Sequence, residues 1–418
     1  MNKKAFKIND LKMGVATASL QIEGGNKNNQ WYDWSIIPGK IADGTNTLRA
    51  VNHYNKVEED TLLMKSMNVE IYRMSLEWAR IEPEEGKFDE KEISHYRHEI
   101  EFIQSQGIEV LVTLHHFTNP TWFENKGAFL SKDAVSIFTN YVSHIVKSFN
   151  DLNLEYCTIN EPNIYATQSY YFGIWPPEKK SFSTAMKVIK QMAKCHVSAF
   201  KAIKKINENT KVGFADSLCN FEPKNKKNIF DRLSARAHNR IFNYAPARAF
   251  AFDQKIWPLG FFGKKHGDYM DFMGINYYTR SRCHLLSNKA TEGAKTNDLG
   301  WEICPEGITI VCEQAYKLFK KEIYITENGT PDSKDDFRAE FIYDHLKEIN
   351  KLPYVKRYYH WSFMDNFEWA LGEKPRFGLV EVNYETEERK VRKSGQFYSE
   401  IIKNKEITED MINNYLKR

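Results

Sequence analysis

The chain has 418 residues, of which 42% are hydrophobic and 27% are charged. These proportions are those of an ordinary globular protein, and they exclude a largely disordered chain or a small disulfide scaffold. The formal net charge of +4, from 59 basic and 55 acidic residues, is too small to indicate a nucleic-acid partner. Short basic clusters such as Lys224, Lys226 and Lys227 are interpreted as solvated lysines. The aromatic share of 14% indicates either a large core or a site lined by rings.

No stretch of 18 apolar residues is present, so no transmembrane helix is expected. The N-terminal segment carries lysines without a following apolar core, which argues against a secretory signal. The six cysteines show neither CxxC nor metal-ligand spacing, and we expect reduced, mostly buried thiols. These features predict a cytoplasmic protein with no membrane or nucleic-acid partner, no metal and no cofactor.

Short apolar segments alternate with helical patterns along the whole chain. Apolar residues at spacings of three and four predict helices over Tyr54–Met67, Val135–Phe149 and Val188–Ile206. The sequence contains neither a Pro/Gly/Ser linker nor a glycine-rich phosphate turn, so it does not favour a doubly wound fold. We therefore predict an α/β protein with a single (β/α)8 TIM barrel, one domain over residues 1–418. Its eight strands are expected at Met13–Thr17, Glu70–Ser75, Glu109–Leu114, Glu155–Ile159, Val212–Ala215, Phe272–Ile275, Ile323–Thr326 and Tyr354–Trp361.

Polar and aromatic residues follow most of the predicted strands. Barrel enzymes carry their chemistry on the loops after the carboxyl ends of the strands, so these residues are expected to meet in one polar pocket with aromatic walls. They are Gln21, Glu23, Arg73, His115, His116, Asn160, Glu161, Asn276, Tyr277, Tyr278, Glu327, Asn328, Trp361, Glu368 and Trp369. Adjacent histidines on a strand point to opposite faces, so His115 and His116 are not expected to share a metal.

Two glutamates stand out in this set. Glu161 ends the strand that begins near Tyr156, and Glu327 ends the strand that leads to the turn at Gly329. In a regular barrel these strands face each other across the mouth, so both carboxylates would point into one pocket. Two carboxyl groups about 5–5.5 Å apart serve glycoside hydrolysis with retention, one as the acid and one as the nucleophile. Taken singly, each glutamate fits equally well a strand-end residue that pairs with a helix terminus.

From Val15 to Tyr398 the sequence resembles glycoside hydrolase family 1, the β-glucosidase family. The likeness lies in blocks that occur in the family's order: Ala16–Gly24, His53–Asp60, Tyr72–Ser75, Trp78–Ile81, Thr113–Phe117, the TINEP segment 158–162, the ITENG segment 325–329, Asp365–Trp369 and Arg376–Leu379. The resemblance implies a retaining exo-β-glycosidase that works by double displacement through a covalent glycosyl-enzyme.

The resemblance also implies roles for single residues. Glu161 matches the acid/base and Glu327 the nucleophile, with Arg73 as its charge partner and Tyr278 as its hydrogen-bond donor. Other matches would hold the sugar or support the mouth: Asn160 at the 2-hydroxyl, Gln21, His116, Glu368 and Trp369 at other hydroxyls, Trp361 beneath the ring, and Phe377 and Asn276 beside them.

A carboxylate at Glu368 would accept bonds from sugar hydroxyls and repel a 6-phosphate. The expected substrate is therefore an unphosphorylated β-D-glucoside or short β-linked oligosaccharide, with β-fucosidase or β-galactosidase activity alongside. Transglycosylation through the same intermediate, 6-phospho-β-glucosidase activity and an inactive sugar-binding barrel are the alternatives. Phe117 and Asn163 stand where the family usually has Trp, and the segments 217–271 and 289–298 resemble trimmed or variable loops. The aglycone and the oligomeric state are therefore not predicted.

Overall fold

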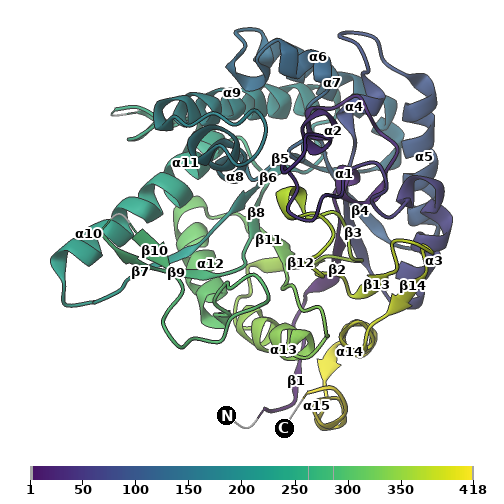
Figure 1. The fold of residues 1–418 in the computed structure, drawn as a ribbon, viewed down its shortest axis with the longest axis vertical. Coiled ribbons are helices and arrows are strands. Elements are labelled where there is room, and N and C mark those ends of the chain that lie inside the picture. The colour runs from purple at the N-terminus through teal and green to yellow at the C-terminus, as the bar shows by residue number, and fades with distance from the viewer. Residues whose placement is uncertain (1–2, 262, 286, 417–418) are drawn as a thin grey trace.

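Eight parallel strands form a closed barrel at the centre of the molecule (Figure 1). The computed structural model describes residues 3–261, 263–285 and 287–416. The barrel confirms the predicted (β/α)8 TIM fold, and every strand overlaps its predicted segment. The barrel strands are β2 (Lys12–Ala16), β3 (Ile71–Ser75), β4 (Glu109–Thr113), β5 (Glu155–Asn160), β6 (Val212–Ser217), β8 (Phe272–Asn276), β11 (Glu322–Asn328) and β12 (Val355–Trp361).

Each barrel strand pairs in parallel with the next barrel strand along the chain, and β12 pairs with β2 to close the ring. Register shifts between Cys157 and Asn160 on β5, and between Ile325 and Glu327 on β11, lie beside the two glutamates singled out from the sequence. Such irregularities redirect side chains and occur next to active sites. The carboxyl ends of all eight strands open on the same mouth.

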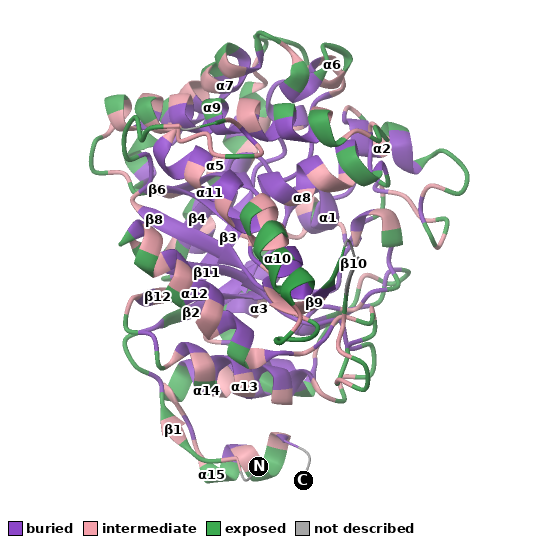
Figure 2. Ribbon diagram, turned by 90° about the vertical axis from the view of Figure 1, so that its left-hand side faces the viewer, coloured by how far each residue is buried: buried purple, intermediate pink, exposed green. Residues whose placement is uncertain are grey.

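Helices surround the barrel, and the three predicted helices are present as α3, α7 and α9. Their apolar stripes pack on the outer face of the strands, while polar residues face solvent (Figure 2). The α-helices are α1 (Ser19–Ile22), α2 (Gln30–Ser35), α3 (Val57–Ser66), α4 (Trp78–Ile81), α5 (Glu90–Ser105), α6 (Thr121–Asn125), α7 (Ala134–Ser148), α8 (Pro162–Ala166), α9 (Phe182–Ile206), α10 (Ile229–His238), α11 (Ala245–Phe252), α12 (Pro305–Phe319), α13 (Arg338–Ile349), α14 (Lys393–Asn404) and α15 (Glu409–Tyr415).

Smaller sheets lie outside the barrel. Strands β7 (Asn220–Pro223), β9 (Arg280–His284) and β10 (Ser287–Lys289) form one sheet, and β13 (Val380–Val382) pairs with β14 (Arg389–Val391) in a hairpin. Strand β1 (Phe6–Lys7) pairs with β15 (Glu406–Ile407), so the two ends of the chain lie together (Figure 1). The segment 217–271, expected as trimmed or variable loops, in fact contains β7, α10 and α11.

The apolar core has two layers, one inside the barrel and one between the barrel and the helices. Cys157 lies in the inner layer and Cys195 in the outer one. All six cysteines are free thiols, five of them buried, as expected from their spacing. Among the described residues, no helix combines the length and apolar character needed to cross a bilayer.

Candidate active site

Glu327 and Arg73 form a buried ion pair at the mouth of the barrel. The Arg73 Nη1 atom lies 2.5 Å from Glu327 Oε1, and the Tyr278 hydroxyl donates to Glu327 Oε2 at 2.6 Å. Charged hydrogen bonds of this kind are stronger than neutral ones and fix the direction of the carboxylate. The structure thus brings residues from β3, from the loop after β8 and from β11 together around one carboxylate.

Asn160 connects the residues around this ion pair. Its Oδ1 accepts hydrogen bonds from Arg73 Nη2 at 2.6 Å and from Asn276 Nδ2 at 3.0 Å. These bonds orient the amide so that its Nδ2 donates to His116 Nε2 at 3.1 Å. Burial, followed by the charge of Arg73, holds the pKa of His116 well below its usual range. The His116 ring is therefore neutral. Because Nε2 accepts a hydrogen bond, the single ring proton lies on Nδ1.

Glu161 lies where β5 ends and α8 begins, in the left-handed region with φ of 42°. Its N–H donates to the carbonyl of Ala215 at 2.8 Å, which links this position to β6. Non-glycine residues in this conformation are strained, and they persist where the surrounding structure holds them. The Glu161 carboxyl is buried and does not cap α8, so it remains available at the mouth of the barrel.

The two glutamates differ in their partners, and this separates their protonation. Burial and then the negative charge of Glu327 raise the pKa of Glu161 to about 8. Burial also raises the pKa of Glu327, but the Arg73 guanidinium and the Tyr278 hydroxyl oppose that rise. When two carboxyls share a pocket, the proton stays on the one with fewer favourable partners. At neutral pH Glu161 therefore carries the proton and Glu327 the charge.

A second polar group lies on the opposite wall. The Gln21 Nε2 atom donates to Asn366 Oδ1 and to the carbonyl of Phe367, both at 2.9 Å, and reaches Glu368 Oε2 at 3.3 Å. Burial and the charge of Glu327 raise the pKa of Glu368 to about 8. This wall therefore presents an amide and a carboxyl side by side, a suitable pair for neutral hydroxyl groups.

Aromatic rings line the space between these groups. His116 lies nearly parallel to Trp361 and to Trp369, with ring centroids 6.0 and 6.1 Å apart. Phe377 meets Tyr278 edge-on at 6.4 Å on the other side of the mouth. Apolar ring faces suit the carbon faces of a sugar, and the polar edges beside them suit its hydroxyls.

Two tryptophans that the sequence analysis did not single out also contribute to these aromatic walls. Trp175 packs on Trp369 at 5.6 Å, and Trp301 meets Tyr278 at 5.7 Å. Phe117, which replaces a tryptophan of the family pattern, contacts both Trp175 and Trp369 at 5.1 Å. Both tryptophans come from long connections between strands, so only the high aromatic content signalled them.

Asn163, which departs from the family pattern, and His115, the neighbour of His116, both have structural roles outside the mouth. Asn163 is buried, and its Nδ2 donates to the carbonyl of Ser217 at 2.7 Å, which joins α8 to the end of β6. His115 points away from the mouth, where its Nε2 bonds Asn119 Oδ1 at 3.0 Å. His116 instead lies against Trp361 and Trp369, so the two histidines, which follow the end of β4, have different surroundings.

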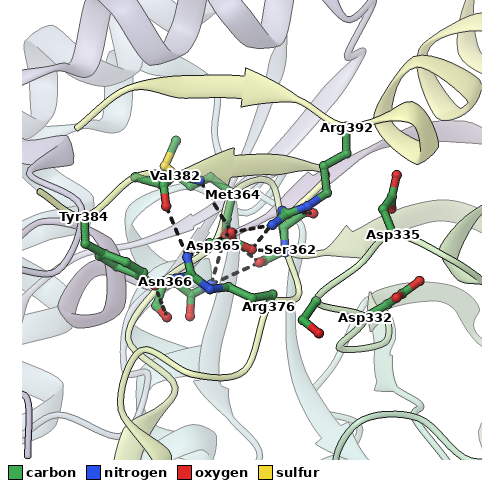
Figure 3. Close-up of polar contacts among 12 residues, drawn as sticks. Asp332, Asp335, Ser362, Met364, Asp365, Asn366, Arg376, Val382, Tyr384 and Arg392 are labelled. Carbon is green, nitrogen blue, oxygen red and sulfur yellow. Dashed lines mark hydrogen bonds and ion pairs between the residues drawn. The ribbon is translucent and has the colours of Figure 1, made fainter. Parts of the chain in front are cut away.

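Asp365, Arg376 and Arg392 form an ionic cluster (Figure 3), and the segment that carries Glu368, Trp369 and Phe377 begins at Asp365. Arg392 donates to both oxygens of Asp365, at 3.0 and 2.8 Å, and Arg376 approaches the same carboxylate at 3.2 Å. Asp365 also accepts from the N–H of Gly378 at 3.0 Å. One carboxylate thus holds the beginning and the end of this segment, here named the clamp segment (residues 365–378).

Several buried polar atoms in the site have no hydrogen-bond partner in the part of the chain that the structure describes. They are Gln21 Oε1, His116 Nδ1 and Glu161 Oε1. Buried polar atoms are almost always satisfied in native proteins. These three, which come from three walls of one pocket, together offer acceptors and a donor to a hydroxyl-rich ligand.

A TIM barrel whose mouth holds two buried carboxyls, further buried polar groups and aromatic walls is the arrangement expected of a glycoside hydrolase. The chain belongs to glycosyl hydrolase family 1, whose model matches residues 3–253 and 264–407. It is 30% identical to beta-glucosidase A of Thermotoga maritima over 97% of this chain and 99% of that one. It is 28% identical to a beta-galactosidase of Pyrococcus woesei over 94% of this chain and 96% of the relative. The solved beta-glycosidase of Pyrococcus horikoshii shares 34% identity and superposes with a TM-score of 0.91, covering 100% of this chain and 99% of that one. The protein is thus a family 1 β-glycosidase.

Proposed function

We propose that this β-glycosidase is a retaining, exo-acting β-glucosidase for unphosphorylated β-D-glucosides, with residues 1–418 acting as one catalytic domain. The observation that carries the proposal is the asymmetry of the two buried glutamates. Glu327 has a cation and a hydroxyl donor at its oxygens, while Glu161 forms no ion pair among the described residues and keeps its proton. A nucleophile must be ionised and an acid must be protonated at the same pH.

In the first step the Glu327 carboxylate attacks the anomeric carbon and forms a glycosyl ester. The bond to the aglycone oxygen breaks, and that oxygen takes the proton of Glu161. In the second step Glu161, now ionised, takes a proton from water while the water oxygen attacks the anomeric carbon. Glu327 leaves as a carboxylate, and two inversions give net retention of configuration.

The surrounding groups would act on the transition state. Positive charge develops on the sugar ring as the aglycone leaves, and the Glu327 carboxylate lies opposite it. The 2-hydroxyl would bond Asn160, whose amide is fixed by Arg73 and Asn276, and this bond strengthens in the transition state. Gln21, His116 and Glu368 would hold the outer hydroxyls over Trp361.

The choice of an unphosphorylated glucoside rests on the wall around Glu368. Its side chain is bonded by Gln21, and no lysine or arginine contact to Glu368 occurs among the described residues. A 6-phosphate placed there would meet a carboxyl group instead of a cation. The likeness to a beta-galactosidase makes the galactoside the closest competitor.

A panel of nitrophenyl β-glycosides tests the substrate assignment. We expect the highest kcat/KM with the glucoside, lower values with the fucoside and galactoside, and none above background with the 6-phosphoglucoside. A higher value with the galactoside or the 6-phosphoglucoside would overturn the assignment. Product analysis with an added alcohol acceptor separates hydrolysis from transglycosylation, because both reactions use the same glycosyl-enzyme.

Glu327→Ala tests the chemistry. Without the carboxylate the glycosyl-enzyme cannot form, and kcat should fall by several decades. Added azide should then attack the anomeric carbon directly and give the α-glycosyl azide, a product of single inversion. Glu322→Ala is the matched control, because Glu322 begins the same strand and lies exposed at the far end of the barrel. Loss of activity in both variants, or a β-azide from Glu327→Ala, would contradict the nucleophile assignment.

A further inference from the structure

Helix α10 carries an exposed apolar surface that the glycosidase site does not use. Ile229, Phe230 and Leu233 are 53%, 63% and 51% exposed, and they lie within one turn of each other on the helix. Leu285, 57% exposed, lies beside them, because its carbonyl accepts a hydrogen bond from Ser234 of α10. Figure 2 shows the exposed outer side of α10 facing the viewer. These four side chains are the apolar part of what we call the α10 patch.

Five cations surround this apolar surface. They are all exposed, and none has an ion-pair partner in the described part of the chain: Lys224, Lys226, Lys227, Arg232 and Arg236. The acidic residues nearby are already engaged. Asp231 is buried and bonds His284 at 2.8 Å, and Glu222 pairs with Arg282. Asp231 can offset at most one of the five charges, so the α10 patch keeps a net positive charge.

Neither feature stabilises the isolated protein. Lys226 and Lys227 precede the first turn of α10, and cations at the N-terminal end of a helix are electrostatically unfavourable. Large apolar side chains held in water gain nothing from the hydrophobic effect. Apolar side chains next to basic ones on one helix are, however, the pattern of a helix that lies in a membrane interface.

We propose that the α10 patch is a docking surface for an anionic lipid bilayer. Ile229, Phe230 and Leu233 would enter the boundary between headgroups and acyl chains, and the five cations would face anionic headgroups. A second copy docking through the same patch would bring two net positive patches together, which disfavours a symmetric dimer. A nucleic acid would use the cations but would leave the aliphatic side chains exposed. The proposal would give a role to Lys224, Lys226 and Lys227, which are exposed, as the solvated-lysine interpretation expects.

The place of α10 in the fold relates this docking to the barrel mouth. Helix α10 packs on β7 and β9, at the periphery of the molecule (Figure 1). Strand β7 begins three residues after β6 ends, and β9 begins four residues after β8 ends. Both connections leave the carboxyl ends of the barrel strands, and one of them carries Tyr278. A bilayer on the α10 patch would therefore lie beside the mouth, not at the opposite end of the barrel.

Co-sedimentation of the full chain with vesicles tests the proposal. We expect binding to vesicles of phosphatidylcholine with about 30% phosphatidylglycerol, and much weaker binding to phosphatidylcholine alone. Each cation near an anionic surface contributes about a five-fold change in binding, so Lys226→Glu with Lys227→Glu should weaken binding by at least about 25-fold. Phe230→Ser with Leu233→Ser should also release the protein, because the apolar insertion is lost. Raising salt should weaken wild-type binding.

Matched variants separate the patch from general effects. Lys91→Glu with Lys187→Glu makes the same change in net charge on α5 and α9, and Leu62→Ser removes an exposed leucine (51% exposed) from α3. Both controls should bind like the wild type. All variants should hydrolyse a soluble nitrophenyl glycoside normally, which shows that they fold. The proposal would be overturned if the wild type did not bind anionic vesicles, or if the controls and the patch variants lost vesicle binding equally. A dimer that Phe230→Ser dissociates, without any vesicle binding, would also overturn it. Binding to RNA that survives Phe230→Ser, without vesicle binding, would overturn it in favour of a nucleic acid.

Discussion

Arg392 donates hydrogen bonds to both carboxylate oxygens of Asp365, although the two residues are 27 positions apart in the chain. Asp365 begins the clamp segment, and Arg392 precedes α14 immediately after the β13–β14 hairpin. Both side chains are buried. The position of the proposed sugar-binding groups Glu368 and Trp369 therefore depends on an ion pair that lies outside the proposed substrate contacts.

Asp365→Asn should weaken the site as well as the fold. The asparagine keeps the shape but leaves Arg392 and Arg376 without their counter-charge, and breaking a buried pair typically costs about 3–5 kcal/mol. A displaced clamp segment should lower kcat/KM for a glucoside by about 10–100-fold. Because Glu368 is proposed to hold the outer hydroxyls, the preference for a glucoside over a xyloside should fall about ten-fold.

The control for this variant is Asp151→Asn. Arg97 also donates to both oxygens of Asp151, each at 2.9 Å, but that carboxylate is 67% exposed. Exposed ion pairs contribute little to stability, so this variant should keep its stability and its glucoside preference. If Asp365→Asn lowered stability but left the ratio of glucoside to xyloside unchanged, the pair would be structural only.

Glu161→Gln should separate substrates by their leaving groups. A dinitrophenyl group departs without a proton, so formation of the glycosyl-enzyme should slow by about ten-fold or less. Cellobiose needs the proton, and its cleavage should slow by about 10²–10⁴-fold. Rapid-quench measurement of the first turnover gives these rates directly. Added azide should restore turnover of the dinitrophenyl substrate and yield the β-glycosyl azide. Equal slowing of both substrates would show that Glu161 is not the acid.

The barrel could be predicted from the sequence because each strand is a short apolar run with a polar end. Strand β5 begins at Glu155 as predicted, and β11 extends its predicted segment by only one residue at the start and two at the end. The glutamate pair was accessible for the same reason, since strand ends meet at one mouth. Trp175 and the pair of Asp365 and Arg392 were not accessible, because loop paths and long-range contacts place them. Helix α10 has apolar residues on its exposed side, so its pattern does not indicate a packed helix.

The pH dependence of kcat/KM should be bell-shaped. Activity should fall above about pH 8, because burial and the charge of Glu327 raise the pKa of Glu161 to about 8 and the acid form is then lost. The acidic limb should reflect Glu327, whose pKa burial also raises above its ordinary value. With cellobiose, whose leaving group needs the proton, the residual activity of Glu161→Gln should lack the alkaline limb. Its persistence would assign that limb to Glu368, whose pKa is raised to the same region.

Glu368→Gln should stabilise the protein while it impairs the site. The pKa of Glu368 is about 8 in the folded protein, raised chiefly by burial, and near 4.5 when unfolded. Between these values the unfolded chain binds fewer protons, so the free energy of unfolding falls as pH rises. Glutamine removes this loss. Because Glu368 keeps some contact with solvent, we expect a gain of about 1–2 kcal/mol at pH 7, shrinking to nothing near pH 4. Thermal denaturation at both pH values measures it, and kcat/KM for the glucoside should fall in the same variant. If the wild type and Glu368→Gln were equally stable at pH 7, or if the gain persisted at pH 4, burial would not be raising the pKa of Glu368.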